Sequence, residues 1–87
     1  MKAEIYTKKD CIYCVRAKQL LEQNKIDFHE YIISPGMGEK PLTENQSYIN
    51  REQLLEKYPA AKTVPQICID DQHIGGYENF VQWLKNK

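Results

Sequence analysis

The chain begins with alternating hydrophobic and polar residues and then changes to helical spacing. In Lys2–Tyr6, Ala3 and Ile5 are separated by polar residues, and this period of two predicts a strand. From position 14 to 24 the apolar positions recur at the spacing of one helix face. That face carries Cys14, Ala17 and Leu21, with Leu20 beside it. The side chains expected to point away from it are Arg16, Lys18 and Glu22.

A second strand is predicted at Phe28–Ile33. A strand, a helix and a strand in so short a space imply a right-handed parallel crossover. The next stretch, Ser34–Gln46, has two prolines, two glycines and no periodicity, so we expect a long loop.

The segment after this loop predicts a helix that ends before Pro59. Two residue pairs could form the capping box at its start, Thr43 with Gln46 or Asn50 with Gln53. The expected apolar face of this helix is Tyr48, Leu55 and Tyr58.

Two short strands and a last helix complete the pattern. The strands are Val64–Ile69 and His73–Gly75, joined by a polar turn at Asp70–Gln72. The helix is marked by Tyr77, Phe80, Val81 and Leu84, with Trp83 near them. The order β-α-β-α-β-β-α predicts an α/β fold, a four-stranded mixed sheet flanked by three helices, in a single domain covering residues 1–87.

Charge and composition limit the classes of partner and the cellular location that we expect. The 87 residues contain 12 basic and 12 acidic side chains, so no overall field would draw the chain to nucleic acid or to a membrane. Residues 1–25 are locally positive, with six basic against three acidic groups. The sequence has neither an apolar run of membrane-spanning length nor a signal-peptide pattern, and we therefore expect a cytoplasmic protein.

The two cysteines of the segment "DCIYC" lie where the first helix begins. Cys11 precedes the helix and Cys14 is in its first turn. Free amides and the positive dipole end of a helix stabilise an anion by about 0.3–1 kcal/mol, which favours a Cys11 thiolate. The nearby positive charges are Lys8, Lys9 and Arg16. Cys14 is on the apolar face and should be more buried, so we expect an exposed nucleophile followed by a resolving thiol.

Metal binding is the alternative for this pair. Structural zinc needs four ligands, whereas one C-x-x-C leaves only Cys68, His29 and His73 at unrelated spacings. Cys68 lies in the apolar run "PQICID" and is expected to be a buried, inert thiol. Both histidines are expected to be ordinary surface or core residues. Redox chemistry at Cys11 and Cys14 is therefore favoured.

Three segments, "YTKKDCIYC", "TVPQICID" and "IGGYENF", resemble those of glutaredoxins, in the family's order and over nearly the whole chain. The resemblance implies a thioredoxin-like fold and a glutathione-dependent disulfide oxidoreductase with Cys11 and Cys14 as its redox-active pair. The lengthened Ser34–Gln46 loop is similar to that of phage glutaredoxins, and partner specificity is expected there.

The resemblance also implies a glutathione site. Lys8 would face the glycine carboxylate of glutathione, and Tyr13 would lie beside its sulfur. Pro65 would follow a cis bond, with the Val64 backbone pairing with the substrate. The other residues that match the family's site are Thr63, Gly76, Tyr77 and Glu78. The last two would hold the γ-glutamyl end, although the Gly75-Gly76 pair also fits a simple turn.

The implied reaction is attack by Cys11 on a protein disulfide or a glutathionylated protein, with Cys14 resolving the first kind of mixed disulfide. Glutathione would be the reducing co-substrate, and no metal is expected. The expected partners are disulfide-containing proteins, with ribonucleotide reductase as a family-level candidate, and the protein is expected to be a monomer serving electron transport and cell redox homeostasis.

Two departures from the family pattern are Ile12, where a proline is usual, and Glu78, where an aspartate is usual. Two other functions remain open. One is a thioredoxin-like redoxin recharged by a flavin reductase, although Asp10 stands where that family usually has tryptophan. The other is a [2Fe–2S] carrier, in which Cys11 of two chains and two glutathiones hold the cluster.

Overall fold

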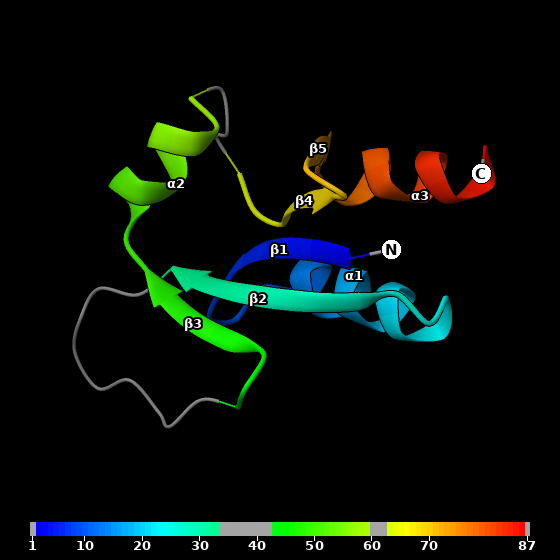
Figure 1. Cartoon of the computed structure of the whole chain (residues 1–87), viewed down its shortest axis with the longest axis horizontal. Helices are drawn as coiled ribbons and strands as arrows, with labels where there is room; N and C mark the ends of the chain where they lie inside the picture. Colours follow the sequence, from blue (N-terminus) through cyan, green and yellow to red (C-terminus); the bar gives the residue numbers. More distant parts are fainter. Residues whose placement is uncertain (1, 34–42, 60–62, 87) are drawn as a thin grey trace.

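The computed structural model of the chain describes residues 2–33, 43–59 and 63–86 (Figure 1). Its elements follow the order β1 (Lys2–Lys8), α1 (Ile12–Gln23), β2 (Asp27–Ile33), β3 (Gln46–Ile49), α2 (Arg51–Lys57), β4 (Gln66–Ile69), β5 (Gln72–Gly75) and α3 (Tyr77–Lys85). The α/β class and the three helices are as the sequence predicts. No helix in these ranges is long and apolar enough to cross a membrane.

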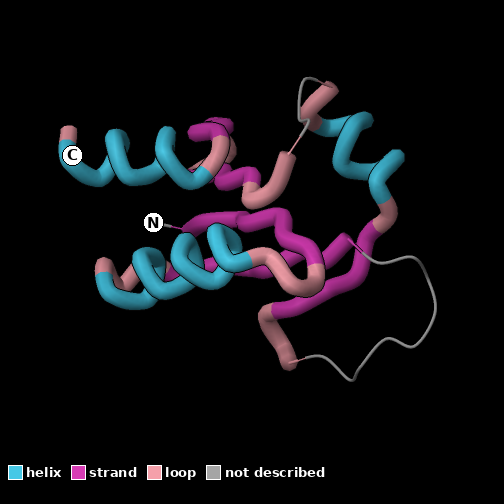
Figure 2. The backbone as a smooth tube through the Cα atoms, turned by 180° about the vertical axis from the view of Figure 1, so that it is seen from behind, coloured by secondary structure: helices cyan, strands magenta, loops and turns pink. Residues whose placement is uncertain are grey.

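The strands form one mixed sheet in the order β3-β2-β1-β4-β5. The first three strands of the chain run parallel to one another, and β4 and β5 are antiparallel to their neighbours. Figure 2 shows α1 in front of the strands and α3 beside it. The main core lies between these two helices and the sheet, and its buried members are Ala3, Ile5, Ala17, Leu21, Ile26, Ile67, Ile69 and Phe80.

A second, smaller core lies on the opposite face of the sheet because the alternation of β1 and β2 turns Tyr6 and Tyr31 that way. Tyr6 and Leu54 are buried there. The partly buried residues around them are Tyr31, Ile33, Ile49, Tyr58 and Val64. Since Leu54 belongs to α2, this short helix covers one end of that face, and helices flank both faces as predicted.

The sheet has five strands, one more than predicted. The extra strand is β3, which includes Tyr48, a residue expected on the apolar face of a helix. Hydrogen bonding to β2 explains the difference, because Glu30–Ile33 offers a parallel partner to these four residues. Residues 34–42 of the predicted loop lie outside the described ranges.

The second helix begins later than the first of the two capping options. Asn50 and Gln53 form the capping box of α2, which confirms the second option. Thr43 and Gln46 also bond to each other, but they lie at the start of β3 instead of a helix. The predicted face was wrong by one position, since Leu54 is buried and Leu55 is exposed.

The turn between β4 and β5 is shorter than predicted. It consists of Asp70 and Asp71, and Gln72 already belongs to β5. Both aspartates have positive φ, 50° and 68°, as the two central residues of a type I′ hairpin turn require. The hairpin leads directly to α3, whose buried anchor is Phe80.

Candidate active site

Cys11 is the N-cap residue of α1. Its extended backbone (φ −109°, ψ 108°) turns the side chain over the end of the helix, where Sγ accepts a hydrogen bond from the Cys14 amide at 3.3 Å. The residue before it, Asp10, has a φ of 60°, which sets the sharp approach from β1. An anion on this sulfur would meet a free helix amide and the positive end of the helix dipole.

The two thiols differ in exposure, as predicted. Cys11 is partly exposed, and Cys14 is 2% exposed on the inner face of α1. Burial raises the pKa of the Cys14 thiol to about 12, and its hydrogen bond with Cys11 acts in the same direction. Cys14 therefore remains protonated at neutral pH in this state, while Cys11 is the thiol that an approaching disulfide can reach.

A loop before β4 lies against the exposed thiol. The Val64–Pro65 peptide bond is cis, as the resemblance implies. The Cys11 thiol donates a long hydrogen bond of 3.9 Å to the carbonyl of Val64, so the sulfur and this backbone segment are neighbours.

A cavity of about 350 Å³ opens beside Cys11. It is lined by Lys8, Cys11, Ile12, Tyr13, Ile33, Arg51, Leu54, Thr63 and Val64. Four residues predicted for the glutathione site, from three separate segments, thus meet around one hollow: Lys8, Tyr13, Thr63 and Val64. Pro65 is buried behind this lining.

Arg51 is a lining residue that the sequence analysis did not find. It is exposed in the first turn of α2, where a positive side chain is unfavourable for the helix dipole. That unfavourable placement was the one signal available in the sequence, and it is a weak one because the cost at an exposed position is only about 0.3–1 kcal/mol. Together with Lys8 it gives the cavity two positive side chains.

The remaining predicted site residues lie beside the cavity and do not line it. The ring of Tyr77 packs on that of Tyr13, with centroids 5.5 Å apart. Gly76 approaches the cis-proline loop, since a Cβ added to it would lie 3.6 Å from the Pro65 carbonyl oxygen. Glu78 is exposed in the first turn of α3, and no described contact joins it to the cysteines.

The leftover metal-ligand types do not assemble. Cys68 is buried, as predicted. His29 bonds the Ser47 hydroxyl and His73 bonds the Gln66 side chain, each at 2.8 Å. Within residues 2–33, 43–59 and 63–86, no three histidine, cysteine or acidic side chains are grouped as they would be around a metal ion.

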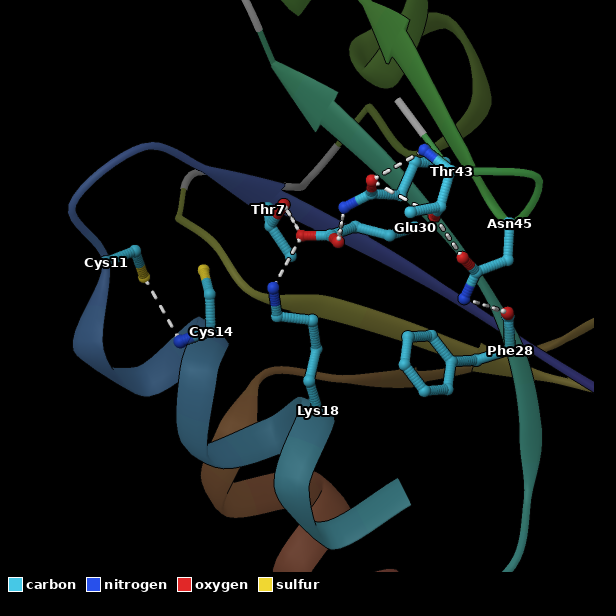
Figure 3. Close-up of polar contacts among 9 residues, drawn as sticks. Thr7, Cys11, Cys14, Lys18, Phe28, Glu30, Thr43 and Asn45 are labelled. Carbon is cyan, nitrogen blue, oxygen red and sulfur yellow. Dashed lines mark hydrogen bonds and ion pairs between the residues drawn. The ribbon is translucent and has the colours of Figure 1, made fainter. Parts of the chain in front are cut away.

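A buried carboxylate lies at the end of the Lys18 side chain, and sequence analysis did not predict it. Glu30 on β2 accepts hydrogen bonds from Thr7 at 2.7 Å, Gln46 at 2.8 Å and Lys18 at 3.0 Å (Figure 3). Burial alone would raise its pKa, but the three donors and the charge of Lys18 outweigh burial and hold the pKa below its ordinary value. Lys18 therefore points inward, which corrects its predicted position on the outer face of the helix.

A dithiol at the start of a helix, next to a cis-proline loop and on a mixed sheet of this order, defines a thioredoxin-fold redox protein. Comparisons with known proteins identify the family within this class. The Glutaredoxin family model matches residues 3–74. The chain belongs to the glutaredoxin family and is a thiol–disulfide oxidoreductase.

Individual relatives agree with this assignment. Glutaredoxin 1 of Escherichia coli (strain K12) is 38% identical over 90 residues, which cover 98% of this chain and 94% of the relative. Glutaredoxin 3 of the same strain is 41% identical over 76 residues, covering 87% and 77%. The three-dimensional structure of reduced Escherichia coli glutaredoxin is similar with a TM-score of 0.71 at 33% identity, covering 100% of this chain and 96% of that one.

Proposed function

We propose that residues 1–87 form a single cytoplasmic domain that uses glutathione to reduce protein disulfides and glutathionylated proteins. The observation that carries the proposal is the cavity beside Cys11, in which an accessible thiol, two cationic side chains and a substrate-facing backbone carbonyl meet. Its size and charge suit a small anionic peptide.

Glutathione has a carboxylate at each end, and the proposed site offers each a partner. Lys8 and Arg51 would attract the glycine carboxylate, because both line the cavity. Tyr13 would pack against the glutathione sulfur beside Cys11. The amides at Gly76 and Tyr77 would receive the γ-glutamyl carboxylate, and the Glu78 carboxylate its amino group.

The reaction proceeds by thiolate–disulfide exchange at Cys11. Attack on a protein disulfide forms a mixed disulfide with Cys11 and releases one substrate thiolate, and Cys14 then displaces the second one, leaving a Cys11–Cys14 disulfide. With a glutathionylated protein, Cys11 takes the glutathione and a second glutathione removes it. Each step has a good leaving thiolate, which is the advantage of dividing the exchange.

A coupled assay tests the proposal. NADPH oxidation is followed with glutathione, glutathione reductase and a small glutathione mixed disulfide, and parallel reactions replace the first two with thioredoxin reductase. We expect turnover only with glutathione. Turnover supported only by thioredoxin reductase would instead assign a thioredoxin-like activity, and turnover with neither would refute the proposal.

Protein substrates are proposed by class only. We propose that the chain acts as a monomer and docks on a disulfide-containing protein through the exposed apolar side chains near Cys11. These side chains are those of Ile12, Tyr13 and Val15. Ribonucleotide reductase is a candidate from the family resemblance. Reduction of such a protein by the wild-type chain, measured by release of substrate thiols, tests this part.

A further inference from the structure

The resolving thiol has to ionise, but its environment opposes ionisation. Cys14 is almost fully buried, and a buried thiol without a stabilising charge is a poor nucleophile at neutral pH. Cys11 cannot supply that charge, because it is either an anion or bound to the substrate during the reaction. A positive group on the inner side of α1 would therefore favour the second step.

Lys18 is such a group. It follows Cys14 by four residues, so the two side chains share one face of α1. In Figure 3 both rise from the helix toward β1 and β2. Burial is the largest influence on the Cys14 pKa and raises it, whereas a hydrogen bond from the Lys8 backbone amide and the charge of Lys18 act in the direction that lowers it.

Glu30 fixes the position of this lysine. The carboxylate is 4% exposed, and it accepts hydrogen bonds from Thr7 of β1 and Gln46 of β3 as well as from Lys18. Three strands and a helix therefore hold it in place. A free lysine would extend into water, whereas this one is held inward by a carboxylate that the sheet has already oriented.

We propose that Lys18 is a positioning residue for the resolving step, held by Glu30 so that its ammonium group stabilises the developing thiolate of Cys14. The inference rests on the proposed function, because it needs Cys14 to act as the resolving thiol. The groups facing Cys14 are Cys11 at the N-cap, Lys18 from α1, the Lys8 amide from β1 and, through Lys18, Glu30 from β2.

The assisted step is a thiol–disulfide exchange in which Cys14 displaces the substrate from Cys11. The Cys14 thiol releases its proton, and its thiolate attacks the Cys11 sulfur of the mixed disulfide. The Cys11–Cys14 bond forms as the bond between Cys11 and the substrate sulfur breaks. The substrate leaves as a thiolate and takes up a proton. Over the attack and resolving steps together, the substrate disulfide is reduced by two electrons and the cysteine pair is oxidised by two.

A single-turnover experiment isolates this step. Cys11 is loaded with glutathione at low pH, the pH is raised to values between about 6 and 9, and release of glutathione is followed. We expect Lys18→Met to slow release at neutral pH. The slowing should be about threefold for each tenfold loss of thiolate, because the stronger nucleophilicity of the more basic thiolate recovers the rest. The pH profile of this variant should move to higher pH, and Lys18→Arg should restore most of the rate.

Controls separate this role from a structural one. In a Cys14→Ser background, Lys18→Met should leave the attack of Cys11 on a glutathionylated peptide unchanged. Lys85→Met removes an equal charge from the exposed end of α3 and should change neither rate. Equal slowing of both reactions, or an unshifted pH profile, would overturn the inference. If the wild-type chain released no glutathione, the resolving role of Cys14, and with it the proposed reduction of protein disulfides, would fail, whereas deglutathionylation through Cys11 alone would stand.

Discussion

At the scale of single residues, the chemistry depends on two thiols three positions apart that meet different surroundings. Cys11 lies at the open end of α1, and Cys14 lies on the face of that helix that packs against the sheet. This asymmetry was predictable because helical periodicity alone puts Cys14 on a stripe with Ala17 and Leu21. This asymmetry leads to different expected activities for the variants Cys11→Ser and Cys14→Ser.

Cys11→Ser should reduce turnover of every substrate to the background rate, since no other described thiol is reachable. Cys14→Ser should retain most deglutathionylation of a peptide, because that route needs only Cys11, and should lose direct reduction of protein disulfides. Both activities are measured in the glutathione-coupled assay. An active Cys11 variant would show that the two roles were assigned wrongly.

Glu30 gives a prediction of stability against pH. Its folded pKa is lower than its ordinary value of 4.5, so the network stabilises the fold above that value, and the stabilisation is lost as pH falls through the lower folded value. Glu30→Gln, which leaves Lys18 without its partner, should lower the free energy of unfolding at pH 7 by about 1–3 kcal/mol. Urea titrations at pH 7 and pH 3 should show this difference shrinking in acid.

The matched control is Glu44→Gln, which changes an exposed carboxylate and should stay within about 0.5 kcal/mol of wild type. If Glu30→Gln lowered the free energy of unfolding equally at both pH values, the charge of Glu30 would be unimportant for stability.

Sequence analysis could not find this network. Lys18 and Glu30 are twelve residues apart, and they meet only because of the packing of α1 on β2.

At the scale of elements, α2 is the least substantial part that contributes to the site. It has only seven residues, yet it supplies Arg51 and Leu54 to the cavity. A helix of this length is not stable from propensity alone, so its cap and its packing decide whether it forms. The function of the cavity should therefore depend on the cap at Asn50.

Asn50→Ala removes one half of the capping box, in which the Asn50 side chain accepts from the Gln53 amide at 2.7 Å. We expect a loss of about 1 kcal/mol in the free energy of unfolding. Because Arg51 would lose its fixed position, the KM for glutathione should also rise. Glu56→Ala, an exposed change in the same helix, is the control, and equal effects of both variants would contradict the role of the cap.

The strands of the sheet show which elements the sequence pattern could predict and which it could not. β1, α1, β2 and the β4–β5 hairpin were predicted because their periodicity or turn residues are local. β3 was not, because four residues of intermediate burial have no pattern of their own and depend on pairing with β2. The cis bond at Pro65 followed from the family resemblance and not from residue preferences, since most bonds before proline are trans.

At the scale of the whole molecule, one core ties the site together. Phe80 of α3 is fully buried among residues of β1, α1 and β4, such as Ile5, Leu21 and Ile67. The same helix begins with Tyr77, whose ring packs on Tyr13 beside the cavity. Packing of α3 against α1 therefore connects the stability of the fold with the geometry around the reactive thiol.

Phe80→Ala should greatly lower the free energy of unfolding of a chain of this size. Losing a buried phenylalanine costs about 3–5 kcal/mol, and the total stability of a domain is about 5–15 kcal/mol. We expect a much lower urea midpoint, and a raised KM for glutathione in the fraction that remains folded, because Tyr77 would no longer be held against Tyr13. Gln82→Ala, an exposed change on the same helix, should shift stability by no more than about 0.5 kcal/mol. If Phe80→Ala lost less than about 1 kcal/mol, α3 would not belong to the cooperative core, and the proposed γ-glutamyl site at its start would lack a fixed position relative to Cys11.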